Sequence, residues 1–198
     1  MFEIMTVCTG NICRSPLAAE LLRTRLSEFS PTITSAGTRG LPAAQMTPEA
    51  QRLAIDRGVP EADAAAHRSR FLLEQFLVSP DLILAMTREH RREIAELAPS
   101  RLRHTFTVRE FARLAQGVSD EQIVDAASAA GADPSARVRA MAALVASQRG
   151  LALPPADASD DDVIDPYRRS WETYLRSANQ LEPAVDAVVH AVTVALAS

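Results

Sequence analysis

The chain has 198 residues, of which 47% are hydrophobic, and it carries a formal net charge of -4. This length and composition suit one well-buried domain over residues 1–198 and exclude a low-complexity chain. The negative charge gives no support for a nucleic-acid partner, so none is expected.

Cysteine content and hydropathy exclude further classes of protein. Both cysteines lie in one short segment, and no Cys or His pair has the spacing of metal ligands, so we expect no disulfide framework, no metal and no other cofactor. The longest apolar stretch, residues 187–197, contains His190 and is too short to cross a bilayer. The N-terminus has no basic leader. We therefore expect no membrane span and a cytoplasmic location.

The first predicted elements are a strand and a helix joined by a short loop. Residues 2–7 are apolar and rich in β-formers, which is typical of a buried strand. Ser15 followed by Pro16 has the pattern of an N-cap and a first helical residue. The loop thus ends at a helix N-terminus, where unpaired N–H groups and the helix dipole favour a bound anion. It reads Cys8-Thr9-Gly10-Asn11-Ile12-Cys13-Arg14.

This loop brings a thiol and a guanidinium together around a space of anion size. Cys8 and Arg14 are predicted on opposite sides of it, so that sulfur can attack phosphorus while Arg14 binds two equatorial oxygens. The field of the helix N-terminus favours the thiolate form of a cysteine placed there. Gly10 and Asn11 tolerate left-handed backbone angles, which turn successive N–H groups inward. Ser15 either stabilises the thiolate through its hydroxyl or serves only as a helix cap.

Strands and helices continue to alternate along the chain. Further strands are predicted over residues 33–35, 82–86 and 105–108. A helix starting at Thr47 ends near Gly58, and another starting at about Arg88 is ended by Pro99. This alternation favours a three-layer α/β fold with a four-stranded parallel sheet and helices on both of its faces.

More helices are predicted in the C-terminal half. Ser119 opens one with a capping box, and Asp133 followed by Pro134 opens another that ends at Gly150. Apolar residues recur at helical spacing over residues 185–196, which predicts an amphipathic covering helix that Pro183 starts or kinks.

The run from Cys8 to Pro16 closely resembles the signature of the low-molecular-weight protein tyrosine phosphatases, a family that also includes arsenate reductases. The resemblance implies that Cys8 forms a phosphocysteine intermediate and that Arg14 binds the phosphate. It covers about residues 3–116 and 160–197, so residues 117–158 are expected to be an inserted helical hairpin: a lid, a partner surface or a passive excursion. Phosphate or another oxyanion is implied to bind the loop residues Thr9, Gly10, Asn11, Ile12, Cys13, Arg14 and Ser15.

The family's general acid is an Asp in an Asp-Pro pair, and Asp165-Pro166 matches it. Such an acid protonates the leaving oxygen and can later take a proton from the water that hydrolyses the thiophosphate. In the competing interpretation, Asp165 only extends the acidic run at residues 160–162, a solvated loop with no task.

The resemblance also implies residues that support the loop and line the cleft. Ser35 and His67 match family residues that support Asn11, although His67 can also be an exposed residue near a helix start. Cys13 either traps an oxidised Cys8 as a reversible disulfide or is a small buried apolar residue.

Leu41 and Tyr167 are expected to form the cleft wall, with Ile12 at the edge of the loop. Family members that act on phosphoarginine resemble this loop with Thr at the position of Ile12, so Ile12 favours phosphotyrosine.

We therefore expect a cysteine-dependent phosphatase that hydrolyses phosphotyrosine in proteins or peptides, or similar aryl phosphate monoesters. One alternative is an arsenate reductase of the same fold, which needs more cysteines than this chain has. The other is a non-catalytic phosphoprotein-binding module, which has no need of Cys8, Arg14 and Asp165 together.

Overall fold

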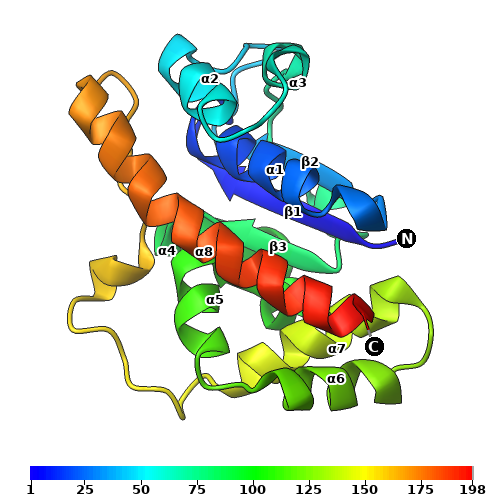
Figure 1. The fold of residues 1–198 in the computed structure, drawn as a ribbon. Coiled ribbons are helices and arrows are strands. Elements are labelled where there is room, and N and C mark those ends of the chain that lie inside the picture. Colours follow the sequence, from blue (N-terminus) through cyan, green and yellow to red (C-terminus); the bar gives the residue numbers. More distant parts are fainter. Residues whose placement is uncertain (198) are drawn as a thin grey trace.

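A computed structural model describes residues 1–197 (Figure 1). Four strands form one parallel sheet in the order β2-β1-β3-β4. Because the strands are parallel, their carboxyl ends meet at one edge of the sheet, where Cys8 of β1 pairs with Gly37 of β2. The predicted sheet and fold class are confirmed. The strands are β1 Glu3–Cys8, β2 Thr32–Gly37, β3 Leu82–Ala85 and β4 Thr105–Thr107.

Helices connect the strands and follow the last one. The predicted helices are present, and two helices that the sequence analysis missed, α3 and α5, join them. The α-helices are α1 Arg14–Arg25, α2 Pro48–Ile55, α3 Glu61–Ala66, α4 Arg88–Leu97, α5 Val108–Ala115, α6 Asp120–Ala129, α7 Pro134–Ser147 and α8 Trp171–Ala197. Short 3-10 helices are η1 Ser27–Phe29, η2 Glu74–Leu77, η3 Pro99–His104 and η4 Ala158–Asp161.

Both faces of the sheet are covered, which gives the three layers. Ile4 and Cys8 of β1 belong to a large core with α1, α5, α7 and α8, whereas Met5 and Val7 face a smaller core with α4 and η2 (Figure 1). This alternation is the two-residue period of a strand, and burial of both faces explains why β1 is mostly apolar. Each fully buried aliphatic side chain contributes about 1.5–3 kcal/mol to stability.

The α6–α7 hairpin is part of the main core. Val138 and Met141 on α7 are fully buried in it. The hairpin is also tied to the sheet, because Arg139 of α7 forms an ion pair of 2.9 Å with the buried carboxylate of Asp81, which precedes β3. A helix packed in this way does not fit a movable lid, whereas the partner surface and the passive excursion considered from the sequence stay predictions. That the hairpin is an insertion relative to the family stays a prediction.

Helix α8 differs most from its predicted form. It begins at Trp171, and Pro183 lies inside it instead of at its start. Proline removes one backbone donor, and the buried neighbours Leu181 and Ala184 hold the helix together across that gap. By length and composition α8 qualifies as a membrane span, but a core helix passes the same test, and α8 packs against α1 and α5. The absence of a membrane span therefore stays a prediction.

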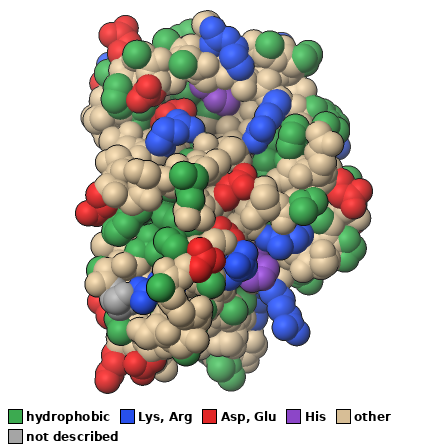
Figure 2. Space-filling view, turned by 90° about the vertical axis from the view of Figure 1, so that its right-hand side faces the viewer, with side chains coloured by type: hydrophobic (Ala, Val, Ile, Leu, Met, Phe, Trp, Pro, Cys, Tyr) green, Lys and Arg blue, Asp and Glu red, His purple; other side chains and the backbone are tan. Residues whose placement is uncertain are grey.

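Charge is dispersed on the face of the molecule shown in Figure 2. Basic, acidic and apolar side chains are interspersed there, without a large patch of one sign. Such a face lacks the positive stripe that a nucleic-acid phosphate backbone recognises.

Candidate active site

The nucleophile loop runs from the end of β1 into α1. Cys8 is 2% exposed. Its sulfur accepts a hydrogen bond from the Asn11 amide at 3.2 Å and lies 2.9 Å from the Ser15 hydroxyl. The predicted cap is wrong: α1 begins at Arg14, and Cys13 takes the N-cap position without a side-chain bond. Ser15 is therefore inside the first turn, where its hydroxyl can hydrogen-bond the Cys8 sulfur.

Asn11 holds the loop in shape. It has a φ of 56°, so the expectation of a left-handed residue is right for Asn11, whereas Gly10 has no positive φ and there it is wrong. The Asn11 side-chain amide donates to Ser15 Oγ at 3.0 Å and to Ser35 Oγ at 2.9 Å. Its Oδ1 accepts from the Arg70 amide at 3.0 Å.

His67 supports the same residue from another side. It follows the end of α3, not a helix start, and its Nε2 lies 2.8 Å from the Asn11 carbonyl oxygen. A carbonyl only accepts, so Nε2 donates. Burial lowers the pKa of His67, although the bond to Asn11 opposes that shift. A supporting role for Ser35 and His67 accordingly fits their contacts with Asn11.

Gly37 is packed against the back of the loop, and the Gly37→Ala variant tests how tightly. A Cβ there would lie 2.4 Å from the Thr9 carbonyl oxygen and 3.0 Å from the Asn11 nitrogen, so the loop must shift. We expect the free energy of unfolding to fall by about 1–3 kcal/mol. Turnover should fall too, because the displaced amides no longer converge on one anion.

The control is Gly131→Ala, measured by the same denaturant and activity assays. Gly131 has a positive φ of 92° and open space around it, so alanine costs stability there without touching the loop. Equal turnover in the two variants would contradict the tight fit of Gly37.

Arg14 reaches across the loop and is 4% exposed. Its Nη1 donates to the Val163 carbonyl at 3.1 Å, and its Nη2 contacts Thr9 Oγ1 at 3.4 Å and Asp165 Oδ2 at 3.0 Å. Its buried Nε has no hydrogen-bond partner. A buried unpaired donor is costly, and an oxyanion in the loop would satisfy it.

Asp165 lies at the mouth of the loop, although it is far from Cys8 in sequence. Its side chain is 52% exposed and bonds Arg14, while its Oδ1 accepts from the Tyr167 amide at 3.2 Å. The two residues before Asp165 are held by hydrogen bonds from their backbone amides. The Val163 amide donates to the Met86 carbonyl at 2.8 Å, and the Ile164 amide donates to Gln180 Oε1 at 2.9 Å.

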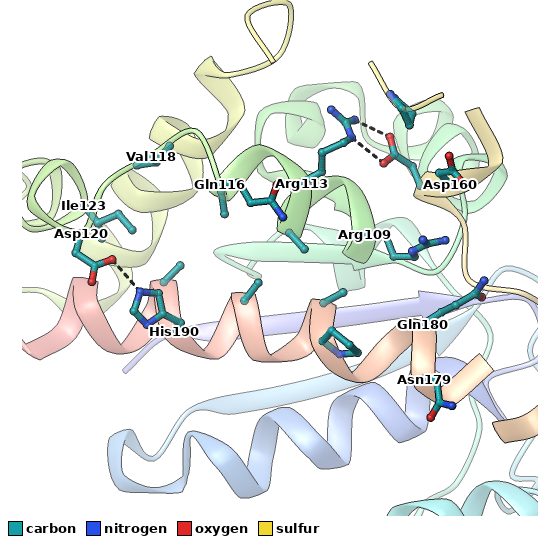
Figure 3. A pocket seen from close by; sticks show the side chains of 18 residues that line it. Arg109, Arg113, Gln116, Val118, Asp120, Ile123, Asp160, Asn179, Gln180 and His190 are labelled. Carbon is teal, nitrogen blue, oxygen red and sulfur yellow. Dashed lines mark hydrogen bonds and ion pairs between the residues drawn. The ribbon is translucent and has the colours of Figure 1, made fainter. Parts of the chain in front are cut away.

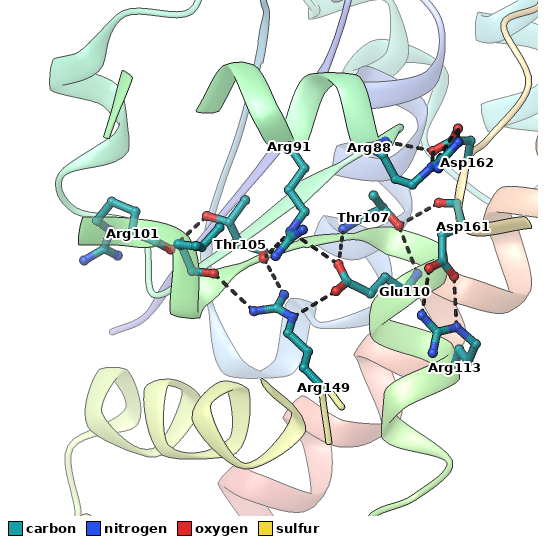
Figure 4. A network of polar contacts seen from close by, with 11 residues as sticks. Arg88, Arg91, Arg101, Thr105, Thr107, Glu110, Arg113, Arg149, Asp161 and Asp162 are labelled. Atoms are coloured by element: carbon teal, nitrogen blue, oxygen red, sulfur yellow. Dashed lines mark hydrogen bonds and ion pairs between the residues drawn. The ribbon is translucent and has the colours of Figure 1, made fainter. Parts of the chain in front are cut away.

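The acidic run before Asp165 is an anchor and not a free solvated loop (Figure 4). Asp161 is buried and forms an ion pair of 2.7 Å with Arg113 of α5, and Asp162 pairs with Arg88 at the start of α4. Thr107, which caps α5, donates its hydroxyl to the Asp161 carbonyl at 2.6 Å. These bonds tie the segment that carries Asp165 to the carboxyl end of β4 and to two helices.

A pocket of about 200 Å³ opens above Cys8. Leu41 and Tyr167 line it, and both are partly exposed. Arg39 also lines it and was missed; its position two residues after the end of β2 was the available signal. The remaining lining residues are Cys8, Thr9, Gly10, Ile12, Cys13, Arg14 and Asp165.

Cys13 is held in polar contacts of its own. Its sulfur lies 3.5 Å from the Tyr174 hydroxyl and 3.6 Å from Thr47 Oγ1. Burial raises the pKa of the Cys13 thiol to about 11. Cys8 and Cys13 are both free thiols. A thiol with so high a pKa is a slow partner in disulfide formation, which favours the buried structural interpretation of Cys13.

His90 is a further residue that sequence reasoning missed. It is buried at the start of α4, and its Nε2 lies 2.8 Å from the Thr9 hydroxyl of the loop. Only its place in the first turn after a buried strand hints at this contact, because carboxyl ends of parallel strands converge.

A larger cavity lies elsewhere. About 800 Å³ lies between α5, α6, α8 and the segment before Asp161 (Figure 3). Two ion pairs lie on its wall, Arg113 with Asp161 at 2.7 Å and His190 with Asp120 at 2.8 Å. The cavity shares no residue with the pocket above Cys8. We place the site at the smaller pocket, because nucleophile, cation and carboxylate meet there.

Comparison with known protein families and solved structures gives the relationship of the whole chain. The family model described as low molecular weight phosphotyrosine protein phosphatase matches residues 3–125. The chain belongs to this family. Among its relatives, the low molecular weight protein-tyrosine-phosphatase Etp of Escherichia coli K12 is 40% identical over 97 residues, which cover 49% of this chain and 62% of Etp. A protein-arginine-phosphatase of Bacillus subtilis is 33% identical over 111 residues, 55% of this chain and 71% of that protein.

Solved structures of phosphatases match the fold over most of the chain. The tyrosine phosphatase Wzb from Escherichia coli K30, in complex with sulphate, has a TM-score of 0.65 at 25% identity, covering 96% of this chain and 98% of that one. The YwlE arginine phosphatase from Geobacillus stearothermophilus has a TM-score of 0.65 at 25% identity, covering 96% and 92%. The matched segment spans 62% of the length of Etp.

Proposed function

We propose that this chain is a cysteine-dependent phosphatase that hydrolyses phosphotyrosine, or similar aryl phosphate monoesters, through a phosphocysteine intermediate. The observation that carries the proposal is the grouping of Cys8, Arg14 and Asp165 around one pocket, with the buried Arg14 Nε lacking a partner. A nucleophile, an anion-binding cation and a carboxylic acid are the three groups that cleavage of a phosphate ester needs.

In the first step, the Cys8 thiolate attacks phosphorus from the floor of the loop, opposite the ester oxygen. The sulfur–phosphorus bond forms as the phosphorus–oxygen bond to the leaving group breaks. Arg14 binds equatorial oxygens through its free donor, and loop amides share the remaining charge. Asp165 gives its proton to the leaving oxygen.

In the second step, water attacks the phosphocysteine and the sulfur–phosphorus bond breaks. The Asp165 carboxylate takes the proton from that water, so one residue acts as acid and then as base. The hydroxyl of Ser15, 2.9 Å from the sulfur, stabilises the departing thiolate by hydrogen bonding. Inorganic phosphate leaves through the mouth of the pocket.

The pocket walls support an aryl substrate. Ile12, Leu41 and Tyr167 offer apolar and aromatic surface against which a phenyl ring packs. The relatives include both tyrosine and arginine phosphatases, so the two substrates are the relevant comparison. A phosphoarginine guanidinium would gain little from Ile12, whereas a phenol ring is apolar up to its oxygen.

We expect the chain to hydrolyse phosphotyrosine peptides at least about tenfold faster, in kcat/KM, than matched phosphoserine or phosphoarginine peptides. Tenfold corresponds to about 1.4 kcal/mol, which is within the free energy that the packing of one aromatic ring contributes. Phosphate release from three peptides that differ only in the phosphorylated residue measures this. Faster release from the phosphoarginine peptide would refute the substrate assignment but leave the phosphocysteine chemistry standing.

The alternative functions have less support. Arsenate reduction needs thiols that carry electrons away, and the only candidate beside Cys8 is Cys13, whose pKa of about 11 disfavours that role. A phosphoprotein-binding module without catalytic activity does not need a carboxylic acid such as Asp165 beside the anion-binding Arg14. Action in the cytoplasm, on protein substrates, stays a prediction from the sequence.

A further inference from the structure

A chain of hydrogen bonds runs from the loop to the start of α4. Thr9 Oγ1 lies 2.8 Å from His90 Nε2, and His90 Nδ1 lies 2.8 Å from Thr87 Oγ1. Thr87 caps α4, because its Oγ1 accepts from the His90 amide at 3.3 Å. At the other end, Arg14 Nη2 donates to Thr9 Oγ1 at 3.4 Å.

His90 is neutral, so its imidazole ring brings only one proton to this series of hydrogen bonds. It is 4% exposed, and burial, with the Arg14 cation adding to it, lowers its pKa to about 4. The charged groups that act on it are Arg14 of the loop and Asp162 of the acid segment, and Asp162 is engaged with Arg88. A neutral imidazole has one N–H donor and one acceptor nitrogen, so two arrangements exist.

In the first arrangement, Thr87 accepts from the His90 amide and donates its own proton to Nδ1. His90 Nε2 then carries the ring proton and donates it to Thr9. Thr9 Oγ1 receives two donors, from His90 and Arg14, which occupy both of its lone pairs. The hydroxyl proton of Thr9 is then available to another acceptor. Since Thr9 lines the pocket above Cys8, that acceptor can be an anion bound there.

In the second arrangement every proton is reversed. Thr9 donates to Nε2, Nδ1 donates to Thr87, and the proton left over belongs to Thr87, which is outside the pocket lining. A phosphate dianion in the pocket decides between the two, because it accepts a hydrogen bond from Thr9 in the first arrangement and none in the second. A hydrogen bond to a charged acceptor is stronger than a neutral one.

We propose that the Thr9 hydroxyl is an additional side-chain donor to the bound phosphoryl group, and that His90 and Thr87 orient its proton toward the pocket. The inference rests on the proposed phosphatase function and deepens it. Thr9 binds the phosphoryl group, whereas His90 is a positioning residue that acts through Thr9. The loop amides alone are then not the whole anion cradle.

The test compares four single variants and one double variant in steady-state hydrolysis of an aryl phosphate and in inhibition by inorganic phosphate. Thr9→Val should lower kcat/KM and raise the phosphate inhibition constant, each by about tenfold, the size of one charge-assisted hydrogen bond. Thr9→Ser, which restores the hydroxyl, should recover most of this loss. Thr34→Val is the matched control, because the Thr34 hydroxyl is buried without a partner in β2.

His90→Phe separates positioning from packing. It should cost about as much as Thr9→Val, and the double variant should cost no more than either alone, because both changes remove the same donor. Additive losses, or a Thr9→Ser variant as impaired as Thr9→Val, would overturn the proposal. So would a phosphate inhibition constant within twofold of the wild-type value in Thr9→Val.

Nitrogen NMR of the wild-type protein with inorganic phosphate tests the proton arrangement without any variant. His90 should be in the Nε2–H form and should not titrate between pH 5 and pH 8. The Nδ1–H form in the phosphate complex would refute the inference even if His90→Phe fails to fold. If no Cys8-dependent hydrolysis is found, the proposed function fails; if hydrolysis is normal in Thr9→Val, only this inference fails.

Discussion

Cys8→Ser should reduce hydrolysis of any phosphate monoester by at least about a thousandfold, since loss of the nucleophile removes the covalent pathway. A serine hydroxyl ionises far less readily than a thiol, and the Asn11 amide with the Ser15 hydroxyl stabilises an anion at that position only if one forms. Inorganic phosphate should still bind, because Arg14 and the loop amides are unchanged. Initial rates and calorimetric titration with phosphate measure the two effects separately.

The control for this variant is a measurement of thermal unfolding, which shows whether the Cys8→Ser protein is folded. The Cys8 side chain is buried, but serine is smaller and keeps a group that can bond Ser15, so the thermal unfolding midpoint should change little. Phosphate binding without turnover is the expected combination. Turnover close to that of the wild type in a folded Cys8→Ser protein would disprove the covalent mechanism.

Asp165→Asn should slow hydrolysis in a way that depends on the leaving group. With phosphotyrosine, whose phenolate needs a proton, kcat/KM should fall by about 10²–10⁴-fold, the usual contribution of a general acid. With an aryl phosphate whose phenol is strongly acidic, the fall should be only a few-fold. Because kcat/KM reports the first irreversible step, a slower second step does not obscure this contrast.

Asp120→Asn is the matched control for that experiment. Asp120 is an exposed carboxylate on α6, paired with His190 away from the pocket above Cys8, so its amide should leave kcat/KM unchanged for both substrates. The measurement is kcat/KM across a series of aryl phosphates of increasing phenol acidity. A loss of the same size on every substrate would mean that Asp165 acts through Arg14 and not as an acid.

The sequence was sufficient where one short segment carries the whole signal. The loop from Cys8 to Arg14 is contiguous, and its spacing alone indicated an anion site at the end of a strand. The parallel sheet followed from alternating apolar strands and helices. Asp165 was found through the Asp-Pro pair, and the structure brings it within 3.0 Å of Arg14.

What the sequence analysis missed depends on contacts between distant segments. His90 lies 81 positions after Thr9, and only its place in the first turn after a buried strand marks it as a neighbour of the loop. Helix α5 starts directly after β4 with no intervening turn, although Thr107 and Glu110 form a capping box that signals it. The sequence pattern left Ser15 as a helix cap or as a donor to the Cys8 sulfur, and the structure places it inside α1, with its hydroxyl 2.9 Å from that sulfur.

The most direct test of the central claim is to trap the phosphoryl group on the enzyme. Asp165→Asn slows hydrolysis of the intermediate, because the base for water is removed, so rapid acid quenching during turnover of a highly activated aryl phosphate should catch it. Peptide mass spectrometry should then find one phosphoryl group, on Cys8, and none in the Cys8→Ser protein. Normal turnover with no phosphorylated Cys8, or with the label on another residue, would contradict the account.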